Sequence, residues 1–448
     1  MIRHSVVPTY LFACLLLGGA SAAGFIANLI LQISALPLIG WALWQMLQKR
    51  PSTAIRAPLG LLALLIAVAL VQLVPLPPAL WTMLPGRSPV IEGYRLLGLA
   101  IPWLPLTLAP AAAIASLLWL LPAFATLLAI IVLGAFRARG IAMAIIAVTI
   151  ASVALGALQI IGSNSAYLYQ ITNYGAAVGF FANANHNATL LLVCVPFLAA
   201  LQTTLLNRNP SPRSASAIRL IIAAAYMVVL VGLLINASLA GIGLCVPVVL
   251  ATWLTFGLHG TAVRRGVTIA AAVMSVATLV IITVGPFGNN LFGEQREHVE
   301  LTRQTSFALT WRAAYDYFPF GSGIGSFQSI YHTQESLSSV GTTYMNHAHN
   351  DWLELLLETG VVGIALAILF LAWWGIRFRA ILRADERDPF ALAASIATAT
   401  ILLHSLVDYP LRTAALSAVF AACVGLMSGV RPYVHRGQTR SMARHFKI

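Results

Sequence analysis

Twelve long apolar runs divide this sequence, and they constrain its fold more than any other feature. A helix that crosses the hydrocarbon core of a bilayer needs roughly 20 mostly apolar residues. Only 9% of the chain is charged and 59% is hydrophobic, so a polar shell could not cover the apolar surface of a water-soluble fold. We therefore predict an all-α polytopic membrane protein, a single membrane domain over residues 1–448, with about twelve transmembrane helices near residues 7–23, 25–46, 57–75, 112–133, 141–161, 187–206, 219–236, 238–257, 267–285, 352–374, 390–408 and 413–430.

The basic residues predict how these helices are oriented. When the loops are assigned alternately to the two sides of the membrane, 20 of the 26 Lys and Arg residues fall on one side. The positive-inside rule makes that side cytoplasmic and places both termini there. The net charge of +13 is then a topology signal that also meets anionic lipid, and we expect no nucleic-acid partner. The first run also fits a cleaved signal peptide, and that alternative stays open.

Ionisable residues are nearly absent from the interiors of the runs and gather near one membrane face. A transporter usually holds such groups at mid-depth, where they meet the ion or proton that it carries. Here they lie in three segments that the topology places on the non-cytoplasmic side: 179–187 (GFFANANHN), the large loop 286–351, and 404–412 (HSLVDYPLR). The sequence therefore predicts a polar site at that face. A shorter, proline-rich segment at 76–111 lies on the same side.

The densest part of this predicted site is the stretch NHAHNDWLELLLETGVVG. Asp351, Glu354 and Glu358 follow one another at helical spacing, so they form one stripe at the start of a helix. A capping box with Asp351 as the N-cap is a structural alternative for the first two, but Glu358 lies too far into the helix for that role. His347 and His349 precede the helix and point the same way if their segment is extended.

These residues resemble those of a known family. The stretch HAHNDWLELLLETGVVG is similar to the signature of the O-antigen ligase and polymerase family of bacterial envelope enzymes, a His-Asn followed by nine residues and Gly-x-x-Gly: His349, Asn350, Gly360 and Gly363. Three further stretches, GFFANANHNATLL, YFPFGSGIGSF and HSLVDYPLR, resemble motifs of the same family. The family-like region is 175–430.

The resemblance implies a metal-independent membrane glycosyltransferase without a cofactor. Such an enzyme takes a glycan from an undecaprenyl diphosphate carrier at the periplasmic face of the bacterial inner membrane and joins it to an acceptor hydroxyl. His349 corresponds to the motif histidine of the family, and a neutral imidazole can take the proton of a hydroxyl near neutral pH. We expect His347 to support it, and Asn350 with a carboxylate, Glu354 or Glu358, to fix the imidazole or the sugar.

The diphosphate of the donor also needs partners. The sequence has no Asp-rich metal motif, and guanidinium groups bind phosphate oxygens in pairs, so arginine is the expected clamp. Few arginines lie on the far side, and we select Arg303, Arg312 and Arg412. Other residues of the motifs and the loop are expected to bind substrate: Asn350, Asp351, Asn183, Asn185, His186, Tyr331, His404 and Asp408.

The chain departs from the family pattern at three positions where many members carry arginine. These positions hold Ala184, Leu239 and Phe307 here. The departures weaken the transfer of diphosphate contacts from the family to this chain, and they suggest a distinct subfamily.

Three functions remain open. We favour a polymerase of exopolysaccharide, capsule or O-antigen repeats, because the departures move the chain away from the ligase-like pattern. A ligase that transfers glycan to lipid A core in lipopolysaccharide assembly, or to another acceptor, would use the same donor. A flippase of lipid-linked oligosaccharide would need basic residues in a central cavity, which the apolar runs lack. Expected partners are the lipid-linked donor, the glycan acceptor, membrane lipids, and chain-length regulator and export proteins.

Overall fold

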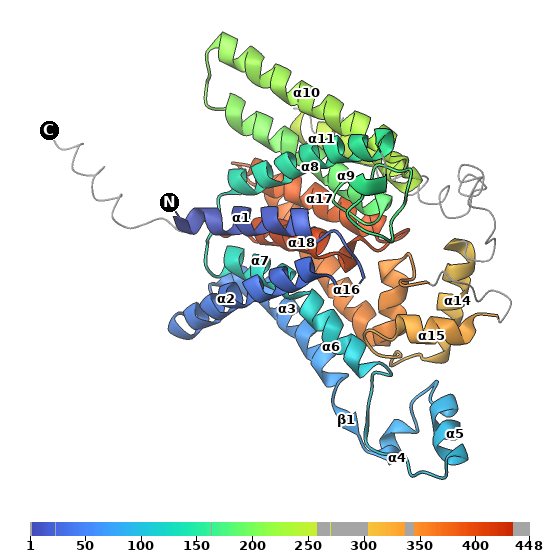
Figure 1. Ribbon diagram of the computed structural model, residues 1–448. Coiled ribbons are helices and arrows are strands. Elements are labelled where there is room, and N and C mark those ends of the chain that lie inside the picture. Colours follow the sequence, from blue (N-terminus) through green and yellow to red (C-terminus); the bar gives the residue numbers. More distant parts are fainter. Residues whose placement is uncertain are drawn as a thin grey trace.

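A computed structural model describes residues 2–22, 24–162, 164–257, 269, 303–336 and 345–432, and this part of the chain is mostly helical (Figure 1). The bundle is built from the long helices: α1 (Ile2–Leu17), α2 (Ile26–Gln48), α3 (Thr53–Val71), α6 (Pro110–Trp119), α7 (Leu121–Ile131), α8 (Ala138–Ile161), α9 (Ala184–Leu206), α10 (Pro212–Asn236), α11 (Leu239–Phe256), α16 (Asp351–Arg383), α17 (Pro389–His404) and α18 (Ala414–Met427). Short elements join them: β1 (Pro75–Leu76), α4 (Pro78–Trp81), α5 (Ser88–Leu96), β2 (Leu104–Pro105), η1 (Asn164–Ala166), α14 (Arg303–Asp316), α15 (Phe327–Gln334) and η4 (Pro410–Arg412).

The bundle confirms the predicted fold class. Eight helices in the described part of the chain are long and apolar enough to cross a membrane, and three shorter apolar helices, α1, α17 and α18, accompany them. Each of these helices overlaps one predicted run. The ninth predicted run, 267–285, lies outside the described residues except for residue 269.

One predicted helix is divided in two. The run near 112–133 becomes α6 and α7, which meet at Leu120. Pro122 is the cause, because proline has no N–H for the helical ladder and favours the first turn of a new helix. The two pieces still form one apolar span from Pro110 to Ile131.

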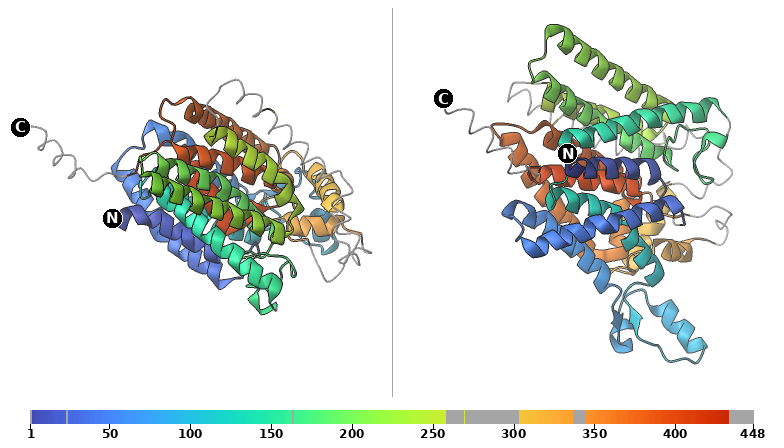
Figure 2. Two further views of the ribbon diagram at one scale, coloured as in Figure 1. Left: turned by 90° about the horizontal axis from the view of Figure 1, so that it is seen from above. Right: turned by 60° about the vertical axis from the view of Figure 1, so that its left-hand side comes forward.

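The centre of the bundle is formed by α9, α17 and α18. Nearly every residue of α17 and α18 is buried, and both helices are rich in Ala, Ser and Thr. Small residues let helix backbones approach closely in a membrane, where packing replaces the hydrophobic effect between helices. By contrast, α2, α3 and α10 expose many of their apolar side chains, as expected for helices that face lipid. Helix α10 lies at the outer edge of the bundle in the right-hand view of Figure 2.

The chain passes back and forth between two ends of this bundle. At one end the N–H of Asp351 donates to the carbonyl of Ser405 at 2.9 Å. At the opposite end the guanidinium of Arg377 donates to the carbonyl of Met427, also at 2.9 Å. We call the first the site end, because α14, α15, η4 and the start of α16 all lie there (Figure 1).

Helix α16 is broken at Gly360, close to the site end. Gly360 has φ 57° and ψ −142°, a conformation that residues with a Cβ adopt only under strain. Backbone bonds from another segment replace the helical ones. The N–H of Gly323 donates to the carbonyl of Glu358, and the N–H of Val361 donates to the carbonyl of Pro319, both at 2.9 Å. The glycine-rich stretch YFPFGSGIGSF is thereby fixed to the first turns of α16.

This break predicts the effect of a single methyl group. Gly360→Ala should lower the stability of the folded protein, because the backbone strain costs about 1–3 kcal/mol and the added Cβ would overlap the Pro319 carbonyl. Thermal unfolding of the purified protein in detergent measures the loss. Gly375→Ala, in the same helix with open space around the new methyl, is the matched control and should be neutral or stabilising. Equal melting temperatures for the two variants would contradict the break.

Candidate functional site

The first turn of α16 holds two of the predicted carboxylates, but not in the capping arrangement. Asn350 is the N-cap, since its Oδ1 accepts from the N–H groups two and three residues further on, both at 3.0 Å. The alternative in which Asp351 is the N-cap is therefore wrong. Glu354 does reach back, but its Oε2 accepts from the N–H of Ala348 at 2.9 Å. The Asp351 carboxylate instead accepts from Ser405 Oγ at 2.7 Å.

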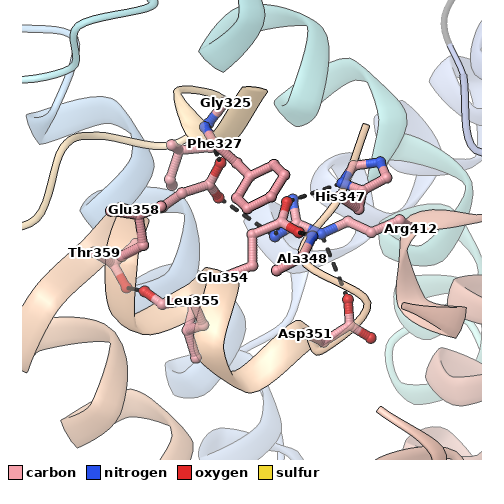
Figure 3. A network of polar contacts seen from close by, with 12 residues as sticks. Gly325, Phe327, His347, Ala348, Asp351, Glu354, Leu355, Glu358, Thr359 and Arg412 are labelled. Atoms are coloured by element: carbon pink, nitrogen blue, oxygen red, sulfur yellow. Dashed lines mark hydrogen bonds and ion pairs between the residues drawn. The ribbon is translucent and has the colours of Figure 1, made fainter. Parts of the chain in front are cut away.

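Arg412 lies at the centre of the carboxylate stripe (Figure 3). Its Nη2 is 3.2 Å from Glu354 Oε1 and 3.3 Å from Glu358 Oε2, and its Nε is 3.6 Å from Asp351 Oδ1. The side chains of Glu354 and Glu358 are only 1% and 3% exposed. Burial opposes the charge on Arg412, but the three carboxylates outweigh it and raise the pKa of the guanidinium. One permanent cation therefore binds three acids of α16 to the η4 turn.

Glu358 also fixes the glycine-rich stretch. Its Oε1 accepts from the N–H of Gly325 at 2.8 Å and from the N–H of Phe327 at 3.4 Å, at the start of α15 (Figure 3). Gln72, just after α3, donates to the Glu358 carbonyl at 3.1 Å and accepts from the N–H of Ile324 at 2.8 Å. These contacts give Glu358 a structural role, although it lies too far into α16 to cap the helix. The catalytic role predicted for Glu358 stays a prediction.

His349 is paired with Asp408 rather than with a carboxylate of α16. His349 has a φ of 50°, in the left-handed region, and its Nδ1 is 3.4 Å from Asp408 Oδ1. Asp408 is fully buried, and the N–H of Tyr409 orients its Oδ1 at 2.9 Å. At this distance Nδ1 of His349 makes no hydrogen bond among the described residues. A slightly closer approach would let the Asp408 carboxylate accept the Nδ1 proton and leave Nε2 to accept another. Glu354, predicted to fix this imidazole, instead contacts Nδ1 of His347 at 2.9 Å.

Tyr409 is a site residue that the sequence analysis missed. The rings of His186, His347 and His349 surround its ring, with centroids 4.9, 4.8 and 4.8 Å away. Its side chain is 5% exposed, and burial raises the pKa of its phenol. The available signal was its place in HSLVDYPLR, directly after Asp408.

The other two motif histidines, His186 and His404, are more deeply buried than His347 and His349. His186 is fully buried, with its Nε2 4.0 Å from Asp408 Oδ1. His404 is also fully buried, and its Nδ1 shares a hydrogen bond of 2.8 Å with Thr189 Oγ1. The motifs at 179–187 and 404–412 therefore converge on Asp408. Substrate binding by either histidine stays a prediction.

The asparagines of the earlier motif shape the start of α9. Asn183 is the N-cap, and its Oδ1 accepts from the N–H of Asn185 at 2.8 Å. Asn185 Oδ1 in turn accepts from Ser238 Oγ at 2.6 Å, which ties the start of α9 to the start of α11. These contacts are structural, and substrate binding by either asparagine stays a prediction.

Three predicted residues of the large loop lie on α14 and α15. Arg312 is exposed on α14, and Arg303 begins that helix, with a side chain outside the described part of the molecule. Tyr331 is only 1% exposed and stacks on Phe327 at a centroid distance of 5.4 Å. These contacts are those of a packing residue, and substrate binding by Tyr331 stays a prediction.

The described residues contain no group of three or more His, Cys, Asp or Glu side chains arranged to hold a metal ion. The carboxylates of α16 are instead engaged by Arg412 and by backbone N–H groups. Metal independence stays a prediction.

Comparison with known proteins finds a match to one family model. Residues 221–368 match the model described as O-antigen ligase. This part of the chain is similar to the O-antigen ligase family. The match confirms the resemblance inferred from the motifs, and it indicates an enzyme that transfers glycosyl groups. It includes His349 and the glycine-rich stretch, whereas the motifs at 179–187 and 404–412 lie outside it. No curated protein matches the chain.

Two of the departures from the family pattern belong to segments that touch each other. The side-chain amide of Asn236 donates to the carbonyl of Ala184 at 2.9 Å, just before Leu239 begins α11. Ala184 and Leu239, where the resemblance led us to expect arginines, therefore lie at neighbouring helix starts. Their proximity was not predicted from the sequence.

The Arg412 cluster predicts a large effect of removing its cation. Arg412→Ala should destabilise the protein by about 3–5 kcal/mol, the usual effect of leaving buried charges without their partner. Arg412→Lys should recover only part of the loss, because an ammonium cannot fork between carboxylates as a guanidinium does. Thermal unfolding in detergent measures both.

The matched control removes the charge on both sides of one pair. Arg412→Gln combined with Glu354→Gln should be more stable than Arg412→Gln alone, because fewer buried carboxylates then lack a cation. If Arg412→Ala melted like the unaltered protein, the guanidinium would not be what holds the stripe together.

Proposed function

We propose that this protein is a metal-independent membrane glycosyltransferase that polymerises undecaprenyl diphosphate-linked oligosaccharide repeats at the periplasmic face of the bacterial inner membrane. The products would be exopolysaccharide, capsule or O-antigen. The single observation that carries the proposal is the His349–Asp408 pair at the site end of the bundle, 3.4 Å apart, inside a chain that matches the O-antigen ligase family.

The pair suits removal of a proton from an acceptor hydroxyl. With the Nδ1 proton held toward Asp408, Nε2 of His349 accepts the proton as the hydroxyl oxygen attacks the anomeric carbon of the donor. The bond between that carbon and the diphosphate oxygen breaks, and undecaprenyl diphosphate leaves with the electron pair. The His349 side chain is 24% exposed, so it can meet a hydroxyl, whereas Asp408 is fully buried and acts through the histidine.

The leaving diphosphate is assigned to the arginines of the large loop. Arg312 is exposed on α14, and Arg303 lies two to three turns earlier on the same helix. Arg412, the third predicted clamp, already has three carboxylate neighbours. It can bind diphosphate only if a phosphate oxygen replaces one of them, so we assign it first to positioning.

A ligase is the second candidate, because the family that residues 221–368 match is described as O-antigen ligase. It would use the same donor, base and leaving group with another acceptor, such as lipid A core. A polymerase extends glycan on the lipid carrier, and a ligase transfers it off the carrier. A lipid-linked oligosaccharide flippase would need no general base, so the next experiment separates it from both.

His349→Ala should lower the rate of glycan transfer by about 10²- to 10⁴-fold, the usual effect of removing a positioned general base. The measurement uses purified protein and lipid-linked repeat units, with chain length read on a gel. His347→Ala should have a milder effect. Asp408→Asn should fall between them, because the amide can no longer hold the Nδ1 proton as a carboxylate does.

The control for this series is His332→Ala. His332 lies on α15, with a 42% exposed side chain bound to Glu335, and its loss should leave the rate unchanged. Binding of the lipid-linked donor should survive in every variant. Long polymer made by His349→Ala at the unaltered rate would overturn the proposed base.

The proposed orientation is tested by cysteine accessibility in intact cells. Ser329 on α15 and Ser211 at the start of α10 are both exposed and lie toward opposite ends of the bundle. A membrane-impermeant maleimide should label Ser329→Cys from outside and Ser211→Cys only after the membrane is opened. Cys245→Ala without an added cysteine is the background. The reverse pattern would place the site end in the cytoplasm.

A further inference from the structure

Residues 73–109 form an arm that projects sideways from the bundle, beside the ends of α3 and α6, in Figure 1 and in the right-hand view of Figure 2. The arm contains α4, α5 and the two-strand pairing of β1 with β2. Both its ends continue directly into apolar spans. An element joined in this way to two spans, and directed sideways, must lie along the membrane surface at that end.

The base of the arm is attached to the glycine-rich stretch of the site. The hydroxyl of Thr107 donates to the carbonyl of Ile324 at 3.1 Å, and the N–H of Leu108 donates to the carbonyl of Ser322 at 3.0 Å. Gln72, the residue just before the arm, accepts from the N–H of Ile324 in the same stretch at 2.8 Å. The arm therefore lies at the site end, and its base has a fixed height relative to the site.

A buried arginine stiffens the arm. The guanidinium carbon of Arg87 lies 5.2 Å from the ring of Trp81 and 5.7 Å from the ring of Tyr317, the residue after α14. Its Nη2 donates to the carbonyl of Leu106 at 2.6 Å. Burial lowers the pKa of Arg87 to about 10, which still leaves it charged at neutral pH. Cation–π contacts on both sides thus hold α4 against the large loop.

The tip of the arm is apolar and has no described protein neighbour covering it. The exposed fractions are 75% for Leu96, 72% for Leu97, 58% for Leu99 and 65% for Trp103. Every residue from Leu96 to Ala100 is exposed, and no charged residue occurs between Arg95 and Arg137. Glu92 and Arg95, by contrast, form an exposed ion pair on α5 at 2.6 Å.

Apolar residues are also exposed where the arm joins the bundle. Leu70 and Val71 are exposed at the end of α3, Val74 is exposed just after it, and Ile114 is exposed on α6. A leucine-rich tip with a tryptophan, beside a charged pair, has the composition of a segment that lies in a membrane interface. A lipid surface would cover the tip and these residues together, whereas a protein bound at the tip alone would not.

We infer that the tip of the 73–109 arm is an interfacial anchor that inserts Leu96, Leu97, Leu99 and Trp103 into the leaflet at the site end. The partner is the lipid surface of the bilayer that holds the bundle. Because the base of the arm is bonded to the glycine-rich stretch, the anchor sets the height of that stretch relative to the headgroups.

The test places a nitroxide label at the tip. Leu97→Cys, just after α5, is compared with Glu92→Cys on α5, both in full-length protein with Cys245→Ala. Cys14, Cys194 and Cys423 are buried, so the protein without an added cysteine should take up no label. The variants are placed in vesicles of phosphatidylethanolamine and phosphatidylglycerol. The ratio of collisions with oxygen to collisions with a water-soluble nickel chelate should be several-fold higher at 97 than at 92.

Two results would overturn the anchor. Equal access of the nickel chelate to both positions would place the tip in water. Spin–spin broadening at 97 that disappears on dilution with unlabelled protein would show that a second copy of the chain covers the tip. Leu99→Cys gives an independent reading if the Leu97 variant does not fold.

Discussion

The guanidinium of Arg412 is the interaction on which the site depends. It contacts Asp351, Glu354 and Glu358, and each of these acids also binds a different segment. Asp351 accepts from Ser405 in the turn after α17. Glu354 contacts the ring of His347 and accepts from the N–H of Ala348, and Glu358 accepts from the N–H of Gly325 in the glycine-rich stretch. Without a permanent positive charge at that point, three buried carboxylates on one helix face would repel one another. His347, whose Nδ1 is 2.9 Å from Glu354 Oε1, owes its position to this arrangement.

The backbone of α16 near Gly360 also holds the glycine-rich stretch in place. Gly360 interrupts α16, and the carbonyl groups freed by the interruption accept N–H groups from the glycine-rich stretch. In a membrane protein such irregular backbone persists only where other protein groups satisfy it. The spacing of the family signature, with Gly-x-x-Gly nine residues after His-Asn, therefore has a physical cause: the first glycine marks the break at which the large loop is attached.

The fold was largely predictable from the sequence because a span needs only length and apolarity, and both are local properties. The site was predictable in part. The carboxylate stripe follows from helical spacing, and His349 follows from the resemblance. The partner of His349 could not be predicted in this way, because Asp408 is far away in sequence and becomes its neighbour only when α16 and α17 pack. The central ring of Tyr409 was missed for the same reason, and the N-cap was misplaced by one residue since Asn350 and Asp351 are both good caps.

The shortness of α17 and α18 has a consequence for the chemistry. With 16 and 14 residues, these helices span about 24 and 21 Å at 1.5 Å per residue, less than the roughly 30 Å of a hydrocarbon core. Arg383 and Arg387 are exposed just before α17 and keep the start of that helix at the water. The missing length therefore falls at the other end of α17, at the turn that carries Asp408 and Tyr409. Activated sugars would then meet their acceptor below the headgroups, where bulk water, the competing nucleophile, is scarce.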